Sequence, residues 1–195
     1  MFFTNARCAK ANVVGGVNNG WKVAMTTLGF ERGSSSTTGY RRFLKEWEVI
    51  LKEAQRLNKS EDLRVRNDLV KAWEKVKIMQ INGYRSLTDS LNNTHNSALL
   101  GACNKMFWSE THRASMELAI DVLGMQGQIL TGTGDAEGMF PGVRRGRADY
   151  PVSEMQASFF FSRSETIWGG TAEIQRNIIG ERALGLPKEP KPQKV

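Results

Sequence analysis

The chain has 195 residues, of which 40% are hydrophobic and 24% are charged, the proportions of an ordinary globular protein that is long enough to bury a core. Its net charge of +7 invites a nucleic-acid function, but the basic residues alternate with acidic ones, which is typical of solvated helix faces. No apolar run reaches membrane-spanning length, and the polar residues 4–7 end the apolar start too early for a signal peptide. We therefore expect a cytoplasmic protein with no nucleic-acid partner and no membrane span.

The cysteines and histidines do not form the pattern of a metal site. Cys8 and Cys103 are too few for a disulfide framework, so we expect two small thiols that are buried or partly buried. His95 lies in a polar connection, and His112 has no third ligand at a suitable spacing. Both histidines are predicted to lie at the surface, and no metal is expected.

The first 17 residues differ from the rest of the chain. Residues 2–7 and 11–15 resemble short extended pieces, and residues 15–20 form a turn cluster rich in Gly and Asn. Helical periodicity then begins, with apolar residues at i, i+3, i+4 and i+7 from Trp21 to Leu28. The same spacing resumes from Tyr40 to Ala54, after a run of small residues with poor helix propensity.

The longest periodic stretch comes after a break at 58–60, with Ser60 as its predicted N-cap. Its apolar positions alternate steps of four and three, which predicts one buried stripe: Val65, Leu69, Ala72, Val76, Met79, Gly83 and Leu87. Another helix is predicted from about Ser97 to Gly124. Its inward positions are expected at Leu100, Cys103, Phe107, Thr111, Ala114 and Leu118.

The end of the chain contains a predicted loop from Gly127 to Tyr150 and two final helices, near 153–166 and 171–183. The polar tail, 187–195, has three prolines and is predicted to be disordered. Long amphipathic helices joined by short connections indicate an all-α fold. We expect an up-and-down four-helix-type bundle with a short extended N-terminal segment.

The most informative stretch runs from Trp168 to Pro187 and begins Trp-Gly-Gly-Thr-Ala-Glu-Ile-Gln-Arg. Because Gly169 and Gly170 carry no side chains, the backbone N–H groups at the start of the next helix are open to an anion or a flat cofactor. The whole stretch closely resembles the C-terminal signature of the acyl-CoA dehydrogenases, flavoenzymes that desaturate acyl-CoA thioesters.

This resemblance spans nearly the whole chain. Residues 20–32, Gly-Trp-Lys-Val-Ala-Met-Thr-Thr-Leu-Gly-Phe-Glu-Arg, are similar to the junction between the family's middle β-domain and its C-terminal helical domain. The resemblance implies a β-domain remnant at 1–17, the helical bundle domain at 18–186 and a disordered tail at 187–195. A complete member also has an N-terminal helical domain and the whole β-domain, so we expect the C-terminal portion of a longer enzyme.

The resemblance also implies an FAD-dependent oxidoreductase of fatty-acid or lipid degradation, in which a carboxylate removes the alpha proton and a hydride leaves the beta carbon. In many members that carboxylate directly precedes the Gly-Thr of the signature, where this chain has Gly169. A second branch carries its base on the first bundle helix, where this chain has Leu-Gly-Phe-Glu31-Arg32. The resemblance therefore implies Glu31 as the catalytic base and Arg32 as a residue that orders the site. The alternative is a pair of ordinary helix-surface charges.

Further site residues are implied by the same signature. Trp168 and Gly169 would line the acyl pocket, with core packing as the alternative for Trp168. The cofactor-binding residues would be Gly170, Thr171, Glu173, Gly124 and Gly127.

Two departures from the usual motifs concern the dinucleotide. The region 57–66 lacks the Phe-Gly that follows an arginine in many members, which leaves Arg64 or Arg66 as a substitute, and Met125 replaces a glycine. Both departures resemble a divergent bacterial branch, some of whose members degrade sterol side chains and form heteromeric assemblies.

The implied partners are an acyl-CoA substrate, an electron-transfer flavoprotein as acceptor, and other subunits in a homo- or hetero-tetramer formed through the bundle. With half of the cleft absent, we expect the isolated chain to be inactive and to bind flavin weakly. Since the family's helical domains form its tetramer core, the alternative function is a non-catalytic assembly subunit. Its contact faces would carry Trp47, Trp73, Phe107 and Trp108.

Overall fold

A computed structural model describes residues 2–34, 37–92, 97–130, 153–188 and 190, except for the side chains of residues 29–34 and 97–99. Its helices are α1 (Gly20–Ser34), α2 (Tyr40–Arg56), α3 (Leu63–Leu91), α4 (Ser97–Leu123), α5 (Glu154–Glu165) and α6 (Ala172–Ile178). A π-helical turn, Ile179–Ala183, extends α6, and short 3₁₀ turns span Lys10–Asn12, Lys59–Glu61 and Gly124–Gln128. The described residues contain no strand, which confirms the predicted all-α fold.

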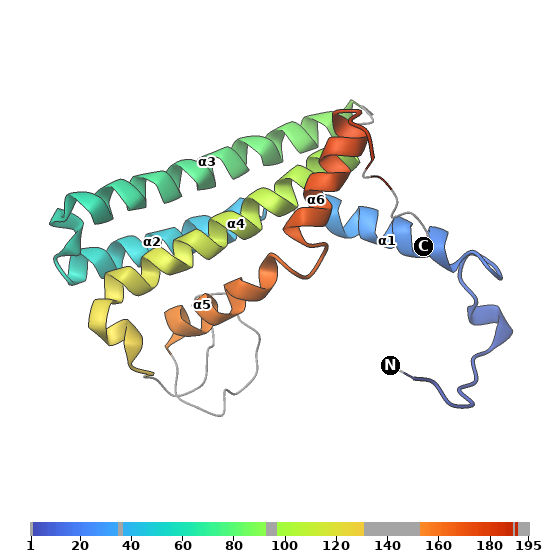
Figure 1. Cartoon of the computed structure of the whole chain (residues 1–195), viewed down its shortest axis with the longest axis horizontal. Helices are drawn as coiled ribbons and strands as arrows, with labels where there is room; N and C mark the ends of the chain where they lie inside the picture. The colour runs from blue at the N-terminus through green and yellow to red at the C-terminus, as the bar shows by residue number, and fades with distance from the viewer. Residues whose placement is uncertain (1, 35–36, 93–96, 131–152, 189, 191–195) are drawn as a thin grey trace.

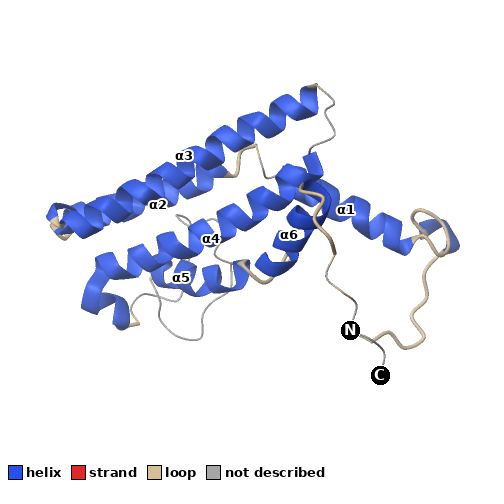
Figure 2. Ribbon diagram, turned by 45° about the horizontal axis from the view of Figure 1, so that its top comes forward, coloured by secondary structure: helices blue, strands red, loops and turns tan. Residues whose placement is uncertain are grey.

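Helix α4 occupies the centre of the molecule (Figure 1). It packs against α2 and α3, which run alongside it, and against α5 on another side, while α6 crosses near its N-terminal half (Figures 1 and 2). Helix α1 contacts α4 but projects away from the bundle. Helix α4 is therefore in contact with every other α-helix of the described chain.

The core has two parts, one at each end of the bundle. The larger part gathers around Ile50, Met116 and Val122, which are fully buried, and the smaller part consists of Phe43, Val76 and Met79. The predicted stripe of α3 is confirmed from Val65 to Gly83. Leu87 is the exception, being 44% exposed near the end of the helix.

Side-chain caps fix the helix starts. The predicted cap at Ser60 is wrong, because Ser60 lies in a 3₁₀ turn and the Asp62 carboxylate accepts the N–H groups of Arg64 and Val65. The last two helices begin as predicted. Ser153 and Gln156 form a reciprocal capping box at the start of α5, and Thr171 caps α6.

The N-terminal part of the chain differs from its prediction. Residues 2–19 are exposed and form no strand, and part of the region expected to be extended is the 3₁₀ turn Lys10–Asn12. A strand needs a neighbouring strand to pair with, and the described residues offer none. The predicted helix α1 is present, but Trp21 is 78% exposed and Met25 is also exposed. Trp21 and Met25 do not enter the core because α1 projects from the bundle (Figure 1).

Within the described residues, no helix is both long enough and apolar enough to cross a membrane. Residues 131–150 of the predicted loop and residues 189 and 191–195 of the predicted tail lie outside the described part of the chain.

Candidate active site

A tight turn, residues 168–171, connects α5 to α6, and we name it the signature turn. Gly169 and Gly170 adopt φ angles of 67° and 95°, in the left-handed region that favours glycine. The turn ends where the hydroxyl oxygen of Thr171 accepts the N–H of Ile174, at 3.2 Å. Two glycines followed by a capping threonine thus explain why the chain reverses here and immediately starts a helix.

Two buried side chains hold the carbonyls of this turn from inside the bundle. Nζ of Lys105 donates to the carbonyl of Gly170 at 2.7 Å, and Nε2 of Gln175 donates to that of Gly169 at 3.2 Å. In a trans peptide the N–H points opposite to the C=O, so the N–H groups of Gly170 and Thr171 face away from these anchors. No backbone carbonyl of the described residues accepts either N–H.

Apolar side chains precede and follow these N–H groups in the chain. Ile167 and Ile174 are exposed, and Trp168 is 42% exposed. The Trp168 indole also packs against Trp108 and Phe161, with ring centroids 5.8 and 6.2 Å away. Trp168 therefore packs at the edge of the core and remains partly exposed, so it fits both interpretations of its role.

Glu173 lies in the first turn of α6 and is exposed. Its own backbone N–H and the Thr171 hydroxyl hold the pKa of this carboxyl below its usual value. The carboxylate is therefore ionised at neutral pH, and it competes with any anion for the start of the helix.

Four charged side chains cluster behind the signature turn, three of them buried and the fourth, Arg42, 25% exposed. Glu165 ends α5, and its carboxylate contacts Nδ1 of His112 on α4 and an Nη atom of Arg42 on α2, the latter at 3.3 Å. Arg42 also donates through Nε to Glu46 at 2.9 Å. Nε2 of His112 lies 3.2 Å from Oε2 of Glu46, without the alignment of a hydrogen bond. Both glutamates are buried, and His112 is only 1% exposed.

The two carboxylates keep the imidazole charged. Burial alone would lower the pKa of His112, but Glu165 and Glu46 outweigh it and raise that pKa above its ordinary value. Burial would likewise raise the pKa of Glu46, but His112 and Arg42 hold it below its ordinary value. A carboxylate oxygen faces each ring nitrogen, and only the doubly protonated ring carries a proton on both. With His112 charged, the two cations, His112 and Arg42, balance the carboxylates of Glu46 and Glu165.

These shifts predict how stability changes with pH. Because the folded pKa of His112 lies above 6.5, its contribution is complete below pH 6.5 and is lost as the pH rises through the folded value. The contribution of Glu46 is complete above pH 4.5 and is lost as the pH falls through its lowered folded value. Urea unfolding from pH 4 to 10 is expected to show the alkaline loss in the parent chain and not in a His112→Leu variant. Equal slopes above pH 6.5 would contradict a charged His112.

The predicted surface position of His112 is wrong, because the residue lies between two helices whose carboxylates it pairs. His95 lies outside the described residues. Cys8 is exposed, contrary to expectation, because the N-terminal segment has no core to enter, whereas Cys103 is partly buried as expected. The described residues include no group of three or more His, Cys, Asp or Glu placed to hold a metal ion.

The structure brings together only some of the predicted site residues. Trp168, Gly169, Gly170, Thr171 and Glu173 share one turn and one helix start. Gly124 and Gly127 lie at the other end of α4, about 28 Å of helix from the lysine that holds the signature turn. Glu31 and Arg32 lie in α1, and their side chains are outside the described part.

Sequence reasoning missed the side chains that support the signature turn from inside. Lys105, Gln175 and the buried charges come from α2, α4, α5 and α6. The Glu-Ile-Gln-Arg segment contained Gln175, but its role as an anchor was not predicted. No sequence signal distinguished Lys105 from a surface lysine.

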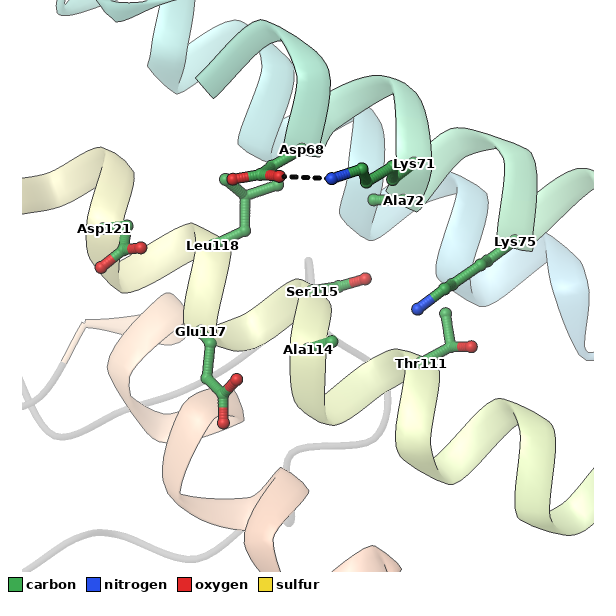
Figure 3. A pocket seen from close by; sticks show the side chains of 10 residues that line it. All are labelled: Asp68, Lys71, Ala72, Lys75, Thr111, Ala114, Ser115, Glu117, Leu118 and Asp121. Carbon is green, nitrogen blue, oxygen red and sulfur yellow. Dashed lines mark ion pairs between the residues drawn. The ribbon is translucent and has the colours of Figure 1, made fainter. Parts of the chain in front are cut away.

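Two hollows lie away from the signature turn. A groove of about 590 Å³ between α2 and α3 is walled by Trp47, Leu51 and Trp73, with Arg66 at its rim. A polar hollow of about 230 Å³ lies between α3 and α4, where Asp68 pairs with Lys71 at 3.5 Å (Figure 3). Neither hollow includes a residue of the signature turn.

Comparison with known proteins gives a consistent result. Residues 18–184 match the family described as "Acyl-CoA dehydrogenase, C-terminal domain". The chain is 36% identical over 191 residues to acyl-CoA dehydrogenase IpdE1 of Mycolicibacterium smegmatis and 34% identical to IpdE1 of Mycobacterium tuberculosis. The match covers 98% of this chain but only 43% and 44% of those relatives.

A solved structure described as the Tcur3481-Tcur3483 steroid ACAD has the same fold, with a TM-score of 0.74 and 24% identity. The likeness covers 96% of this chain and 45% of that one. The chain thus spans less than half the length of the proteins that it matches.

Proposed function

Because this chain belongs to the acyl-CoA dehydrogenase family, we propose that it supplies the flavin-facing helical domain of an FAD-dependent enzyme. That enzyme desaturates an acyl-CoA thioester between its alpha and beta carbons. The observation that carries the proposal is the signature turn, whose N–H groups at Gly170 and Thr171 face outward between exposed apolar side chains. A flat ring system with hydrogen-bond acceptors at its edge fits such a surface.

The residues of the turn fit FAD in chemistry as well as in shape. When bound, FAD accepts the hydride from the beta carbon. The N–H groups of Gly170 and Thr171 would donate to its polar edge, and Ile167 and Trp168 would cover its apolar face. Since Glu173 is ionised, it would accept a hydrogen bond from a hydroxyl of the cofactor, whereas it would repel a phosphate.

Within the same proposal, Glu31 takes the alpha proton and Arg32 orders the site. A carboxylate in a pocket from which water is excluded becomes a stronger base, which the weakly acidic alpha carbon requires. A Cβ built at Gly169 would make only an ordinary contact, with Cε of Lys105 at 3.6 Å, and the glycine itself presents no side chain to a ligand. The absence of a side chain there accommodates a base that reaches the substrate from another helix.

The same glycine favours a bulky acyl group over a slender one. In the complete enzyme, the absence of a side chain at Gly169 would leave more room for the acyl group. One protein with this fold is described as a steroid ACAD. We therefore propose a ring-bearing acyl thioester as the substrate class.

The remaining contacts belong to a larger assembly. Gly124 and Gly127 are too far from the signature turn to meet the same end of a dinucleotide, so we assign them, with Arg64 or Arg66, to its other end or to the flavin of a facing subunit. The exposed Phe2, Phe3 and Trp21 support packing against further protein. A tetramer, electron transfer to an electron-transfer flavoprotein and a cytoplasmic location complete the proposal.

The 195 residues alone are expected to bind FAD weakly, because they span less than half the length of the relatives that they match. A fusion placing this chain behind the N-terminal and β-domains of the Mycolicibacterium smegmatis relative is expected to purify as a yellow flavoprotein. In that fusion, Gly170→Ala should weaken FAD binding about tenfold or more, because a Cβ at φ 95° strains the turn and blocks approach.

Gly185→Ala is the matched control, since Gly185 also has a positive φ, 64°, but faces open space outside the turn. Visible absorbance and FAD titration measure both variants. A fusion that folds and assembles without flavin would refute the enzymatic proposal and favour the assembly-subunit alternative.

A further inference from the structure

Lys105 is a lysine in an unusual place. It lies on α4 and is 6% exposed, yet its ammonium donates to two main-chain carbonyls, Glu165 at 2.8 Å and Gly170 at 2.7 Å. Burying an ammonium is strongly unfavourable unless hydrogen bonds replace its water. The proposed chemistry does not use Lys105, so the burial of its ammonium must have another cause.

The two acceptors differ in how firmly they are held. Glu165 ends α5, and its carboxylate is fixed by His112 and Arg42, so its carbonyl belongs to a rigid frame. A cation next to the last carbonyls of a helix is also favoured by the helix dipole. Gly170 belongs to the signature turn, five residues later. Lys105 therefore ties the turn to the frame.

The orientation of one peptide plane follows from this tie. The carbonyl of Gly170 and the N–H of Thr171 belong to the same planar trans peptide and point in opposite directions. Fixing the carbonyl toward α4 aims the N–H outward. Both glycines have positive φ angles, and glycine is flexible, so the turn would otherwise sample other orientations.

We propose that Lys105 is the positioning residue of the signature turn: by holding the carbonyls of Glu165 and Gly170, it aims the N–H of Thr171 at the bound cofactor. The cofactor part of this inference rests on the proposed function, whereas the hold on the turn does not. Gln175 performs the same task one peptide earlier, through the carbonyl of Gly169. Two adjacent peptides are thus oriented from inside the bundle.

Amide hydrogen exchange on the 195-residue chain tests the hold on the turn without any flavin. Lys105→Met keeps the apolar stem and removes the ammonium. Exchange at residues 166–175 is expected to rise about ten- to a hundredfold, the effect of losing charge-assisted hydrogen bonds, while α2 and α3 keep their protection. Lys105→Arg retains the charge, so its amide exchange at residues 166–175 should stay closer to that of the parent chain. Lys75→Met, at an exposed lysine of α3 far along the bundle from the turn, is the matched control and should change nothing there.

Unchanged exchange at 166–175 in Lys105→Met would overturn the proposal. Loss of protection throughout the bundle would also overturn it, because Lys105 would then be a general core residue rather than an anchor of the turn. The same variant in the flavoprotein fusion should weaken FAD binding and shift the flavin absorbance bands. If exchange at residues 166–175 rose while FAD affinity and the flavin spectrum stayed parental, the proposed effect of Lys105 on cofactor binding would be refuted. A parent fusion that never binds flavin would refute the proposed function and leave the exchange result standing.

Discussion

Replacing His112 with leucine is expected to destabilise the bundle by about 3–5 kcal/mol, the usual cost of removing one partner from a buried ion pair. The substitution leaves Glu46 and Glu165 buried with Arg42 as their cation, so a net negative charge stays inside the protein. It also removes a ring that packs against Phe43, with centroids 5.4 Å apart. Urea unfolding at pH 6, where His112 is charged in the folded chain, measures the loss.

A double-mutant cycle separates the charge effect from packing. Glu46→Gln removes one of the two carboxylates, so the double variant should lose less stability than the sum of the two single variants. Glu53→Gln is the control, because Glu53 pairs with the exposed Arg56, and a salt bridge open to solvent contributes at most about 1 kcal/mol. If His112→Leu proved as mild as Glu53→Gln, the buried charges would contribute little to the stability of the fold.

The sequence predicted the fold well where burial follows one helix face. The stripe of α3 recurs at steps of three and four, so its pattern alone identified the core side of the helix. The caps at Ser153 and Thr171 could likewise be predicted from local chemistry. The pattern failed at α1, whose apolar spacing is helical although Trp21 is exposed. Periodicity reports which residues share a face, and only tertiary structure decides what covers that face.

The buried charges escaped prediction for a different reason. Arg42 and Glu46 are spaced i, i+4, the usual pattern of a surface ion pair, and nothing local shows that His112 and Glu165 complete them. The four residues come from three helices, separated by up to 123 positions in the chain. Only the packing of α2 and α5 on α4 brings them together. The signature turn was predictable because its glycines and threonine are contiguous, whereas its supports are not.

Helix α4 carries a residue that holds the signature turn and a residue of the buried charge cluster. Lys105 and His112 are seven residues apart on it, two helical turns, and therefore lie on one face. Lys105 contacts the carbonyl of Glu165, and His112 contacts the carboxylate of the same residue. A change in the buried charges therefore acts directly on the residue to which the signature turn is tied. Variants of the cluster are expected to alter the turn as well as the stability of the bundle.

The largest functional effect is expected from Glu31→Gln in the flavoprotein fusion. The substitution keeps the shape and the hydrogen-bonding capacity of the side chain but removes its ability to accept a proton. Loss of a positioned general base costs roughly a hundred- to ten-thousandfold in rate. Flavin content should be unchanged, because Glu31 is not among the residues assigned to the cofactor. Anaerobic reduction of the flavin by an acyl-CoA, followed by stopped flow, measures the step directly.

Two further variants sharpen the test of Glu31. Glu48→Gln, on the exposed side of α2, should reduce flavin at the parental rate. Adding Gly169→Glu to the Glu31→Gln fusion returns a carboxylate to the family's other base position, and a partial recovery of the rate is expected. The recovery is limited because Gly169 has a φ of 67°, which a glutamate adopts only with strain. If Glu31→Gln reduced its flavin as fast as the parent, Glu31 would be a helix-surface charge, and the base would have to come from elsewhere.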